Sequence, residues 1–166
     1  MTAARRGLLT AVVAALCVAL LAADVVLWLH NRHGAAVERA RSQAVAAARE
    51  AARDILSYDY RSLKTDIAKA KSETTGLFAK QYAGTAGTLL AQAAELRAIV
   101  QATPASPPAV VSATSDEVVV LVFVDQASVK QPAGAKTPAT RIDQSRVQMT
   151  MTKVGDTWKV SQLAAL

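Results

Sequence analysis

The feature that most constrains this chain is an apolar run close to its N-terminus. Between Leu8 and Leu29 one residue is charged, Asp24. As an α-helix these 22 residues would extend about 33 Å, which exceeds the hydrocarbon core of a bilayer at about 30 Å. Trp28 lies near the end of the run, where interfacial aromatic side chains are favoured. We therefore predict that this run is a transmembrane anchor and that residues 1–7 form a short cytoplasmic tail.

A cleaved signal peptide is the alternative interpretation of the same run. Cleavage requires small residues at positions −3 and −1, and a cut after Ala22 would place Leu20 at −3. An uncleaved anchor fits these residues better. Arg5 and Arg6 lie just before the run, and this pair favours a cytoplasmic N-terminus. We therefore expect a single-pass protein of the cytoplasmic membrane, with its C-terminal domain on the outer, periplasmic or cell-wall side.

Residues 30–57 are predicted to form a juxtamembrane helix, because they are rich in Ala, Arg, Glu and Gln. Small side chains recur along it at steps of three or four residues, in a stripe that ends at Asp54. The stripe consists of Ala40, Ala44, Ala47 and Ala51. Small residues let another helix approach closely, so this stripe is the candidate interaction surface. A second interpretation, which we favour, is that the helix lies on its own domain.

A second helical stretch is predicted to begin near Ser62. Its buried side is predicted at Leu63, Ile67 and Ala70. Gly76 interrupts the pattern, which then resumes. The apolar spacing from Leu89 to Val100 predicts the last turns of a helix that ends before Pro104.

The C-terminal part of the chain predicts antiparallel strands. Residues 118–124 are β-branched, aliphatic or aromatic throughout, which is typical of a central strand. Residues 130–140 contain two prolines and one glycine, which indicates an exposed loop. Helices followed by antiparallel strands give an α+β fold, which we assign to residues 58–166.

The most specific structural prediction is a hairpin near the C-terminus. Residues 146–152 alternate between polar and apolar side chains, and Gly155-Asp156 fits a two-residue turn. The turn sets the cross-strand pairs, which are Val154 with Thr157, Lys153 with Trp158 and Met151 with Val160. Both strands then place their large apolar side chains on one face. These side chains are Val147, Met149, Met151, Trp158 and Val160.

The composition excludes several kinds of active site. One cysteine permits no intrachain disulfide, and the two histidines, His30 and His33, lie beside the predicted anchor. The net charge of +6 lacks the aromatic interleaving of a nucleic-acid surface. Asp59 and Asp66 stand seven residues apart and would share a helix face, but helix capping accounts for them better. We therefore predict no catalytic residue, cofactor, metal or nucleic-acid partner, and hence no enzyme.

Several short signatures, in this order, resemble the Mce-associated membrane proteins of actinobacteria. They are residues 57–60 (SYDY), Asp66, Phe78, Tyr82, residues 120–126 (VLVFVDQ), residues 143–147 (DQSRV) and residues 158–160 (WKV). The resemblance implies a domain similar to the nuclear transport factor 2-like cone, in which helices pack on a curved antiparallel sheet. It also implies an accessory or stabilising role in Mce systems, which move lipids or sterols across the actinobacterial envelope.

Two alternatives to the accessory role follow from the same cone. It could bind an acyl chain or a sterol, or it could act as an isomerase or hydrolase, because ketosteroid isomerases share this fold. We expect a non-catalytic, membrane-anchored accessory subunit of an Mce-type import complex. Its expected partners are Mce-complex proteins, the membrane and, in the first alternative, a lipid.

Overall fold

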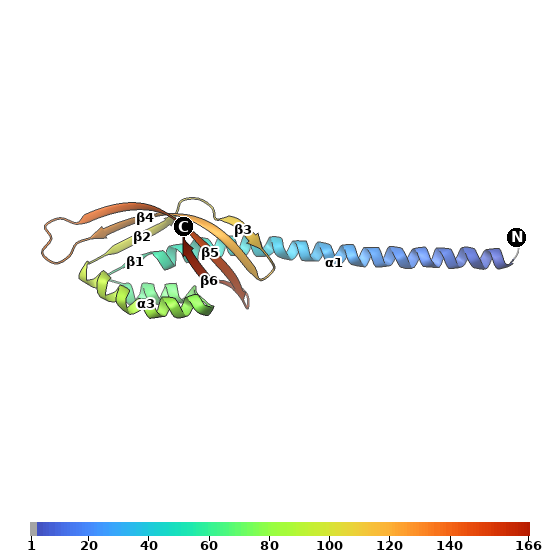
Figure 1. The fold of residues 1–166 in the computed structure, drawn as a ribbon, viewed down its shortest axis with the longest axis horizontal. Coiled ribbons are helices and arrows are strands. Elements are labelled where there is room, and N and C mark those ends of the chain that lie inside the picture. The colour runs from blue at the N-terminus through green and yellow to red at the C-terminus, as the bar shows by residue number, and fades with distance from the viewer. Residues whose placement is uncertain (1–2) are drawn as a thin grey trace. The chain divides into compact units, whose positions relative to one another are not determined.

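The computed structural model describes residues 3–166, which form three helices and a six-stranded sheet (Figure 1). Before Gly34 only some side chains are described. Of the predicted tail, residues 1–7, and of most of the predicted anchor, residues 8–29, the side chains therefore lie outside the described part of the structure. Among the residues that are described, no helix has both the length and the hydropathy needed to cross a membrane.

The first helix, α1 (Ala3–Leu56), contributes to two compact units of the chain, Met1–Glu38 and Arg39–Leu166. The second unit is the folded domain, and it includes the last turns of α1. Several side chains of residues 40–55 are buried in the core of this domain. The folded domain therefore begins before residue 58, inside the segment predicted as a separate juxtamembrane helix.

Two shorter helices follow, α2 (Leu63–Ser72) and α3 (Gly76–Glu95). The predicted buried side of α2 is confirmed at Leu63, Ile67 and Ala70. Both helices belong to the folded domain, and α2 and α3 contact each other.

The C-terminal end of α3 differs from the prediction. Arg97 has a φ of 44°, and the N–H of Ala98 donates to the carbonyl of Ala93 at 2.9 Å. A left-handed residue followed by this bond is a motif that ends helices. The predicted helix through Val100 is therefore wrong, and Ile99–Pro104 forms strand β2 instead.

The sheet is antiparallel throughout, with the strand order β1-β2-β4-β5-β6 and with β3 beside β4. The other strands are β1 (Tyr58–Asp59), β3 (Ala109–Ala113), β4 (Glu117–Lys130), β5 (Ala139–Val154) and β6 (Thr157–Ala165). The predicted central strand, residues 118–124, is the first half of β4. It pairs with β3 on one side and with β5 on the other. Figure 1 shows the sheet curling over α3 and the last turns of α1.

The predicted hairpin is confirmed. The cross-strand pairs are Val154 with Thr157, Lys153 with Trp158 and Met151 with Val160. Gly155 in the turn has a φ of 61°, which a residue with a side chain rarely adopts. On the outer face, Thr152 Oγ1 donates to Ser161 Oγ at 2.8 Å. The turn and the alternation therefore specify the same register.

The core lies between residues 40–55 of α1 and the concave face of the sheet. The sheet contributes large side chains, namely Val118, Val120, Val122, Val124, Val147, Met149, Met151, Trp158 and Val160. α1 contributes small ones, namely Ala40, Ala44, Ala48, Ala51 and Ala52. Small residues on the helix let it lie close to the curved sheet. Among the described side chains, the buried ones are apolar except for that of Thr74.

Candidate functional site

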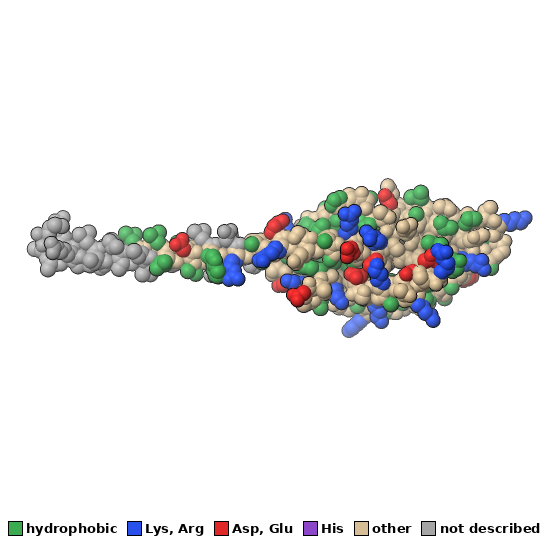
Figure 2. Space-filling model, turned by 180° about the vertical axis from the view of Figure 1, so that it is seen from behind, with side chains coloured by type: hydrophobic (Ala, Val, Ile, Leu, Met, Phe, Trp, Pro, Cys, Tyr) green, Lys and Arg blue, Asp and Glu red, His purple; other side chains and the backbone are tan. Residues whose placement is uncertain are grey.

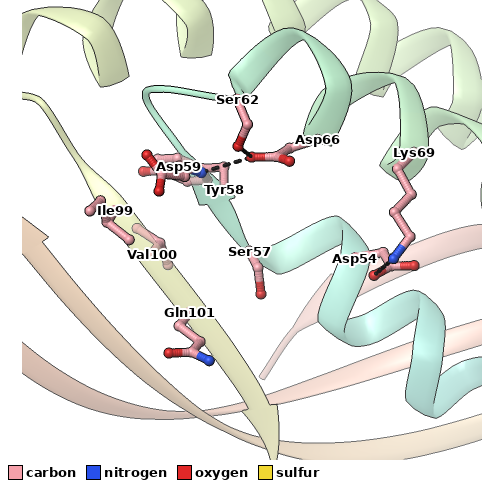
Figure 3. Close-up of a pocket in the computed structure, with 10 residues that line it drawn as sticks. All are labelled: Asp54, Ser57, Tyr58, Asp59, Ser62, Asp66, Lys69, Ile99, Val100 and Gln101. Atoms are coloured by element: carbon pink, nitrogen blue, oxygen red, sulfur yellow. Dashed lines mark hydrogen bonds and ion pairs between the residues drawn. The ribbon is translucent and has the colours of Figure 1, made fainter.

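A cavity of about 280 Å³ opens where the end of α1, β1, α2 and β2 meet (Figure 3). Most of its lining residues carry polar side chains, and they include carboxylates from three segments of the chain. The lining residues are Asp54, Ser57, Tyr58, Asp59, Ser62, Asp66, Lys69, Ile99, Val100 and Gln101. The cavity thus brings together Asp59 and Asp66, the two carboxylates that the sequence singles out, with Asp54 and Lys69.

Asp54 and Lys69 form an ion pair at one side of the cavity. Lys69 Nζ donates to Asp54 Oδ1 at 2.8 Å and so joins α2 to the end of α1. The Asp54 side chain is 12% exposed and that of Lys69 is 64% exposed. The hydrogen bond to Asp54 raises the pKa of Lys69. A lysine with a raised pKa is a poor general base at neutral pH, so this pair acts as a link between helices.

Asp66 ties the start of α2 to β1. One of its oxygens, Oδ2, accepts from the backbone N–H of Asp59 at 2.9 Å and from Ser62 Oγ at 3.0 Å. Asp66 also lies in the first turn of α2, where a negative charge is favoured by the helix dipole. Asp66 thus lies in the first turn as predicted, but its carboxylate bonds to β1 and to the Ser62 hydroxyl, and no side chain caps α2 by a hydrogen bond.

Asp59 is held by its neighbour Arg61. The backbone N–H of Arg61 donates to Asp59 Oδ1 at 2.9 Å, and the guanidinium forms an ion pair with the same carboxylate. The hydrogen bond from the Arg61 side chain lowers the pKa of Asp59. A carboxylate with a lowered pKa stays ionised and accepts a proton weakly.

The chemistry available to this cavity follows from these contacts. Asp54, Asp59 and Asp66 each accept hydrogen bonds from groups of the chain itself. A general base needs an accepting atom that can reach the proton of a substrate. Within the described part of the chain, no three His, Cys, Asp or Glu side chains are placed to hold a metal ion. The arrangement is that of a structural network that fixes α1, β1 and α2 together.

The alanine stripe of α1 requires a correction. Ala40, Ala44 and Ala51 are buried in the core of the domain, and Ala47 is packed against that core. Ala48 and Ala52, which the predicted stripe omits, are 0% exposed. The stripe does serve close packing, but its partner is the sheet of the same chain. It is therefore unavailable as the predicted surface for another protein, because the strongly curved sheet occupies it.

A second cavity, of about 310 Å³, lies beside the first, with which it shares Tyr58 and Val100, between the end of α1, α3, β1, β2, β4 and β5. Its lining residues are Ile55, Leu56, Tyr58, Leu89, Val100, Gln126, Ser128, Lys130 and Asp143. Side chains two residues apart on a strand share a face, so this face of β4 changes from Val124 to Gln126, Ser128 and Lys130. The cavity is thus apolar where α1, α3 and β2 line it and polar where β4 and β5 do.

Charges of both signs share the surface of the domain. On the face shown in Figure 2, acidic side chains lie beside Lys and Arg. Within the described part of the chain, ion pairs join Arg61 with Asp59, Lys69 with Asp54 and Arg141 with Asp143. On this face the excess of positive charge is therefore dispersed.

Comparison with known sequences identifies mycobacterial relatives. The profile of a family described as "Uncharacterized protein Rv1363c/MT1408-like" matches residues 7–165. "Outer membrane protein Rv1973" of Mycobacterium tuberculosis (strain ATCC 25618 / H37Rv) is 29% identical over 123 residues, which are 74% of each chain. "Uncharacterized protein Rv1362c" of the same strain is 31% identical over 119 residues, which are 72% of this chain and 52% of that one. The resemblance to an actinobacterial family is thus confirmed at the level of these mycobacterial proteins.

Solved structures share the fold at low sequence identity. An IcmL-like type IV secretion system protein from Legionella pneumophila aligns with a TM-score of 0.59 and 16% identity, over 76% of this chain and 91% of that one. The periplasmic domain of DotI aligns with a TM-score of 0.56 and 15% identity, over 74% and 91%. A nuclear transport factor 2-like superfamily protein from Salmonella enterica aligns with a TM-score of 0.53 and 14% identity, over 76% and 92%. The predicted α+β, nuclear transport factor 2-like fold is confirmed.

Proposed function

The chain belongs to the Rv1363c/MT1408-like family, and we propose that it is a membrane-anchored, non-catalytic accessory subunit of an Mce-type lipid or sterol import complex. Its folded domain, Arg39–Leu166, works outside the cytoplasmic membrane in this proposal. The partners are proteins of the import complex, which the domain stabilises by contact.

The non-catalytic role is supported by the polar groups of the domain, which hold its helices and strands together. The interior between α1 and the sheet is filled with apolar side chains, and Thr74 is the one buried polar residue among those described. In the polar cavity, each carboxylate is engaged in fixing one element to another. These contacts suit a rigid docking module better than acid–base chemistry, which needs a proton-transferring group within reach of a substrate.

The location is supported by the relatives and by the apolar run. Rv1973 is described as an outer membrane protein, and DotI contributes a periplasmic domain of the same fold. Residues 8–29 are long enough to anchor such a domain to a membrane. Holding the domain at the membrane surface raises its effective concentration for partners in the same membrane.

Affinity purification of the tagged full chain from native actinobacterial membranes tests the proposal. Subunits of an Mce-type complex should be enriched by mass spectrometry. A tagged control that ends at Glu38 keeps the proposed anchor and lacks the folded domain, so it should lose this enrichment. Equal recovery with the two chains, or no Mce-type subunit with either, would contradict the proposal.

The outward location has its own test. In a Cys17→Ser background, Lys136→Cys places a thiol in the exposed loop between β4 and β5. An impermeant maleimide should label this cysteine in intact spheroplasts. Labelling that occurs only after detergent lysis would place the domain on the cytoplasmic side.

Amphiphile binding is a second candidate function, favoured by the second cavity, of about 310 Å³. Pockets for small ligands begin at about this size and combine apolar walls with a few polar groups. A fluorescent fatty acid should bind the full chain, and Leu89→Arg in the cavity wall should abolish binding. Leu77→Arg, at a 67% exposed position outside the cavity lining, is the matched control and should leave binding unchanged.

A further inference from the structure

The first half of β5 lies at an edge of the sheet, where it pairs with β4 on one side. β4 pairs with residues 139–152 of β5 on this side. On the other side, β6 pairs with β5 from Val147 to Val154. Among the described residues, no strand lies along the other side of residues 139–145. In Figure 1 the C-terminus lies near the middle of the sheet, and the loop between β4 and β5 extends well beyond it.

The hydrogen-bonding groups on this free edge can be identified from the last bond of the hairpin. The N–H of Leu166 donates to the carbonyl of Arg146 at 2.9 Å, so the backbone groups of Arg146 face the edge. In an antiparallel strand, every second residue presents its N–H and C=O on the same side. Thr140, Ile142 and Gln144 therefore direct their backbone groups toward the free edge.

The side chains along this edge differ from those that normally protect an edge strand from pairing with another chain. Edges are normally protected by charges that oppose pairing. Here the charges are of opposite sign and flank a large apolar residue: Arg141 and Asp143 lie on either side of Ile142, which is 74% exposed. Arg141 Nε donates to Asp143 Oδ1 at 2.7 Å, so the two side chains lie on the same face.

This pattern is complementary to itself. We propose that the free edge of β5 pairs with the same edge of a second copy of the chain, in an antiparallel two-fold arrangement centred on Ile142. In that register Ile142 faces its own copy, Arg141 faces Asp143 of the second copy, and Thr140 faces Gln144. Every outward backbone group of these strands then has a partner, and each charge faces its opposite.

Other two-fold registers fit the edge less well. Centring the pair on Arg141 or on Asp143 places like charges directly opposite each other, which is unfavourable. Centring it on Gln144 places Ile142 opposite Arg146 and removes the apolar pair. Opposite charges and the exposed isoleucine thus select a single register.

Such an edge contact is small, so it is weak in dilute solution and gains from two copies being held in one membrane. The inference concerns assembly, and it rests on the proposed function for the membrane anchor alone.

Disulfide trapping of the full chain, in native membranes and in a Cys17→Ser background, tests the register. Ile142→Cys should form a disulfide-linked dimer on mild oxidation, because directly opposite Cα atoms lie about 4.5–5.5 Å apart, within disulfide range. Thr140→Cys and Gln144→Cys should each fail to form a homodimer. Co-expressed with different tags, these two variants should cross-link to each other.

Reversing the charge of Arg141 or of Asp143 provides a second test of the same register. Added to Ile142→Cys, either Asp143→Arg or Arg141→Asp should cause loss of the cross-linked dimer, because like charges then face each other. Co-expression of these two reversed chains should restore it, which also shows that both variants are folded. Three results would each overturn the proposal. They are the absence of a cross-linked dimer from Ile142→Cys itself, a homodimer from Gln144→Cys, and a cross-link to a chain of different mass.

Discussion

Trp158 connects the C-terminal hairpin to α1, and its neighbour Lys159 provides a matched control. Trp158 is 6% exposed, and its Nε1 donates to Gln43 Oε1 at 3.3 Å. We expect Trp158→Ala to lower the free energy of unfolding by about 3–5 kcal/mol, because it leaves a cavity in the core. Lys159→Ala, on the outer face of the same strand, should change it by less than about 0.5 kcal/mol. Urea denaturation of the two variants measures the difference, and equal losses would show that the faces are assigned wrongly.

Glu73 gives the domain a pH dependence with a defined sign. Burial, together with the charges of Asp54 and Glu50, raises the pKa of Glu73. The folded state therefore holds this proton more tightly than the unfolded state does. Stability from this group is fully present below the unfolded pKa of about 4.3 and is lost as the pH rises through the folded pKa.

Glu73→Gln removes this loss of stability at higher pH. The variant should therefore have a larger free energy of unfolding than the wild-type chain at pH 7. The advantage over the wild-type chain should shrink as the pH falls toward 4, where Glu73 is itself protonated. Denaturation across this pH range measures it, and Glu95→Gln at an exposed position is the control. An advantage that stays constant with pH would instead assign the effect of Glu73→Gln to packing.

At the scale of elements, α1 depends on alanine where it meets the sheet. Ala48 is 0% exposed, whereas Ala46, two residues away, is exposed. We expect Ala48→Leu to destabilise the domain by about 1–3 kcal/mol, because the added atoms force the helix away from the sheet. Ala46→Leu should be close to neutral, and urea denaturation compares the two. Equal stability would mean that α1 is packed more loosely than its buried alanines indicate.

The elements also show what local sequence determines. The hairpin was predictable because the turn at Gly155 and the alternation on both strands specify one register. β2 was mispredicted because Leu89 to Val100 has helical spacing, while the left-handed Arg97 that ends α3 carries no glycine signal. The alanine stripe indicated close packing correctly, but a stripe of small residues does not say whether the partner is another chain or the same one.

The polar cavity was predictable only in part, for a similar reason. Asp66 stands in the first turn of α2, so its local role follows from the sequence. The ion pair of Lys69 with Asp54 joins residues fifteen positions apart, and it forms because the chain reverses between α1 and α2. No local pattern marks such a contact.

At the scale of the whole molecule, the chain combines a nuclear transport factor 2-like fold with membership of a mycobacterial family. The curled sheet aligns with periplasmic domains of secretion systems and with nuclear transport factor 2-like proteins, which differ widely in sequence. A fold shared so broadly does not specify an activity. The function therefore depends on how this domain uses its cavities, its surface and its attachment.

Uptake of a labelled lipid per import complex, in cells that lack this chain, tests the accessory role most directly. The amount of complex is measured by quantitative mass spectrometry of the same membranes, and re-expression of the wild-type chain serves as the control. If the chain only stabilises the complex, total uptake and complex abundance fall together, and uptake per complex stays unchanged. A fall in uptake per complex at normal abundance would show that the chain performs a step of transport or chemistry, and would contradict the proposal.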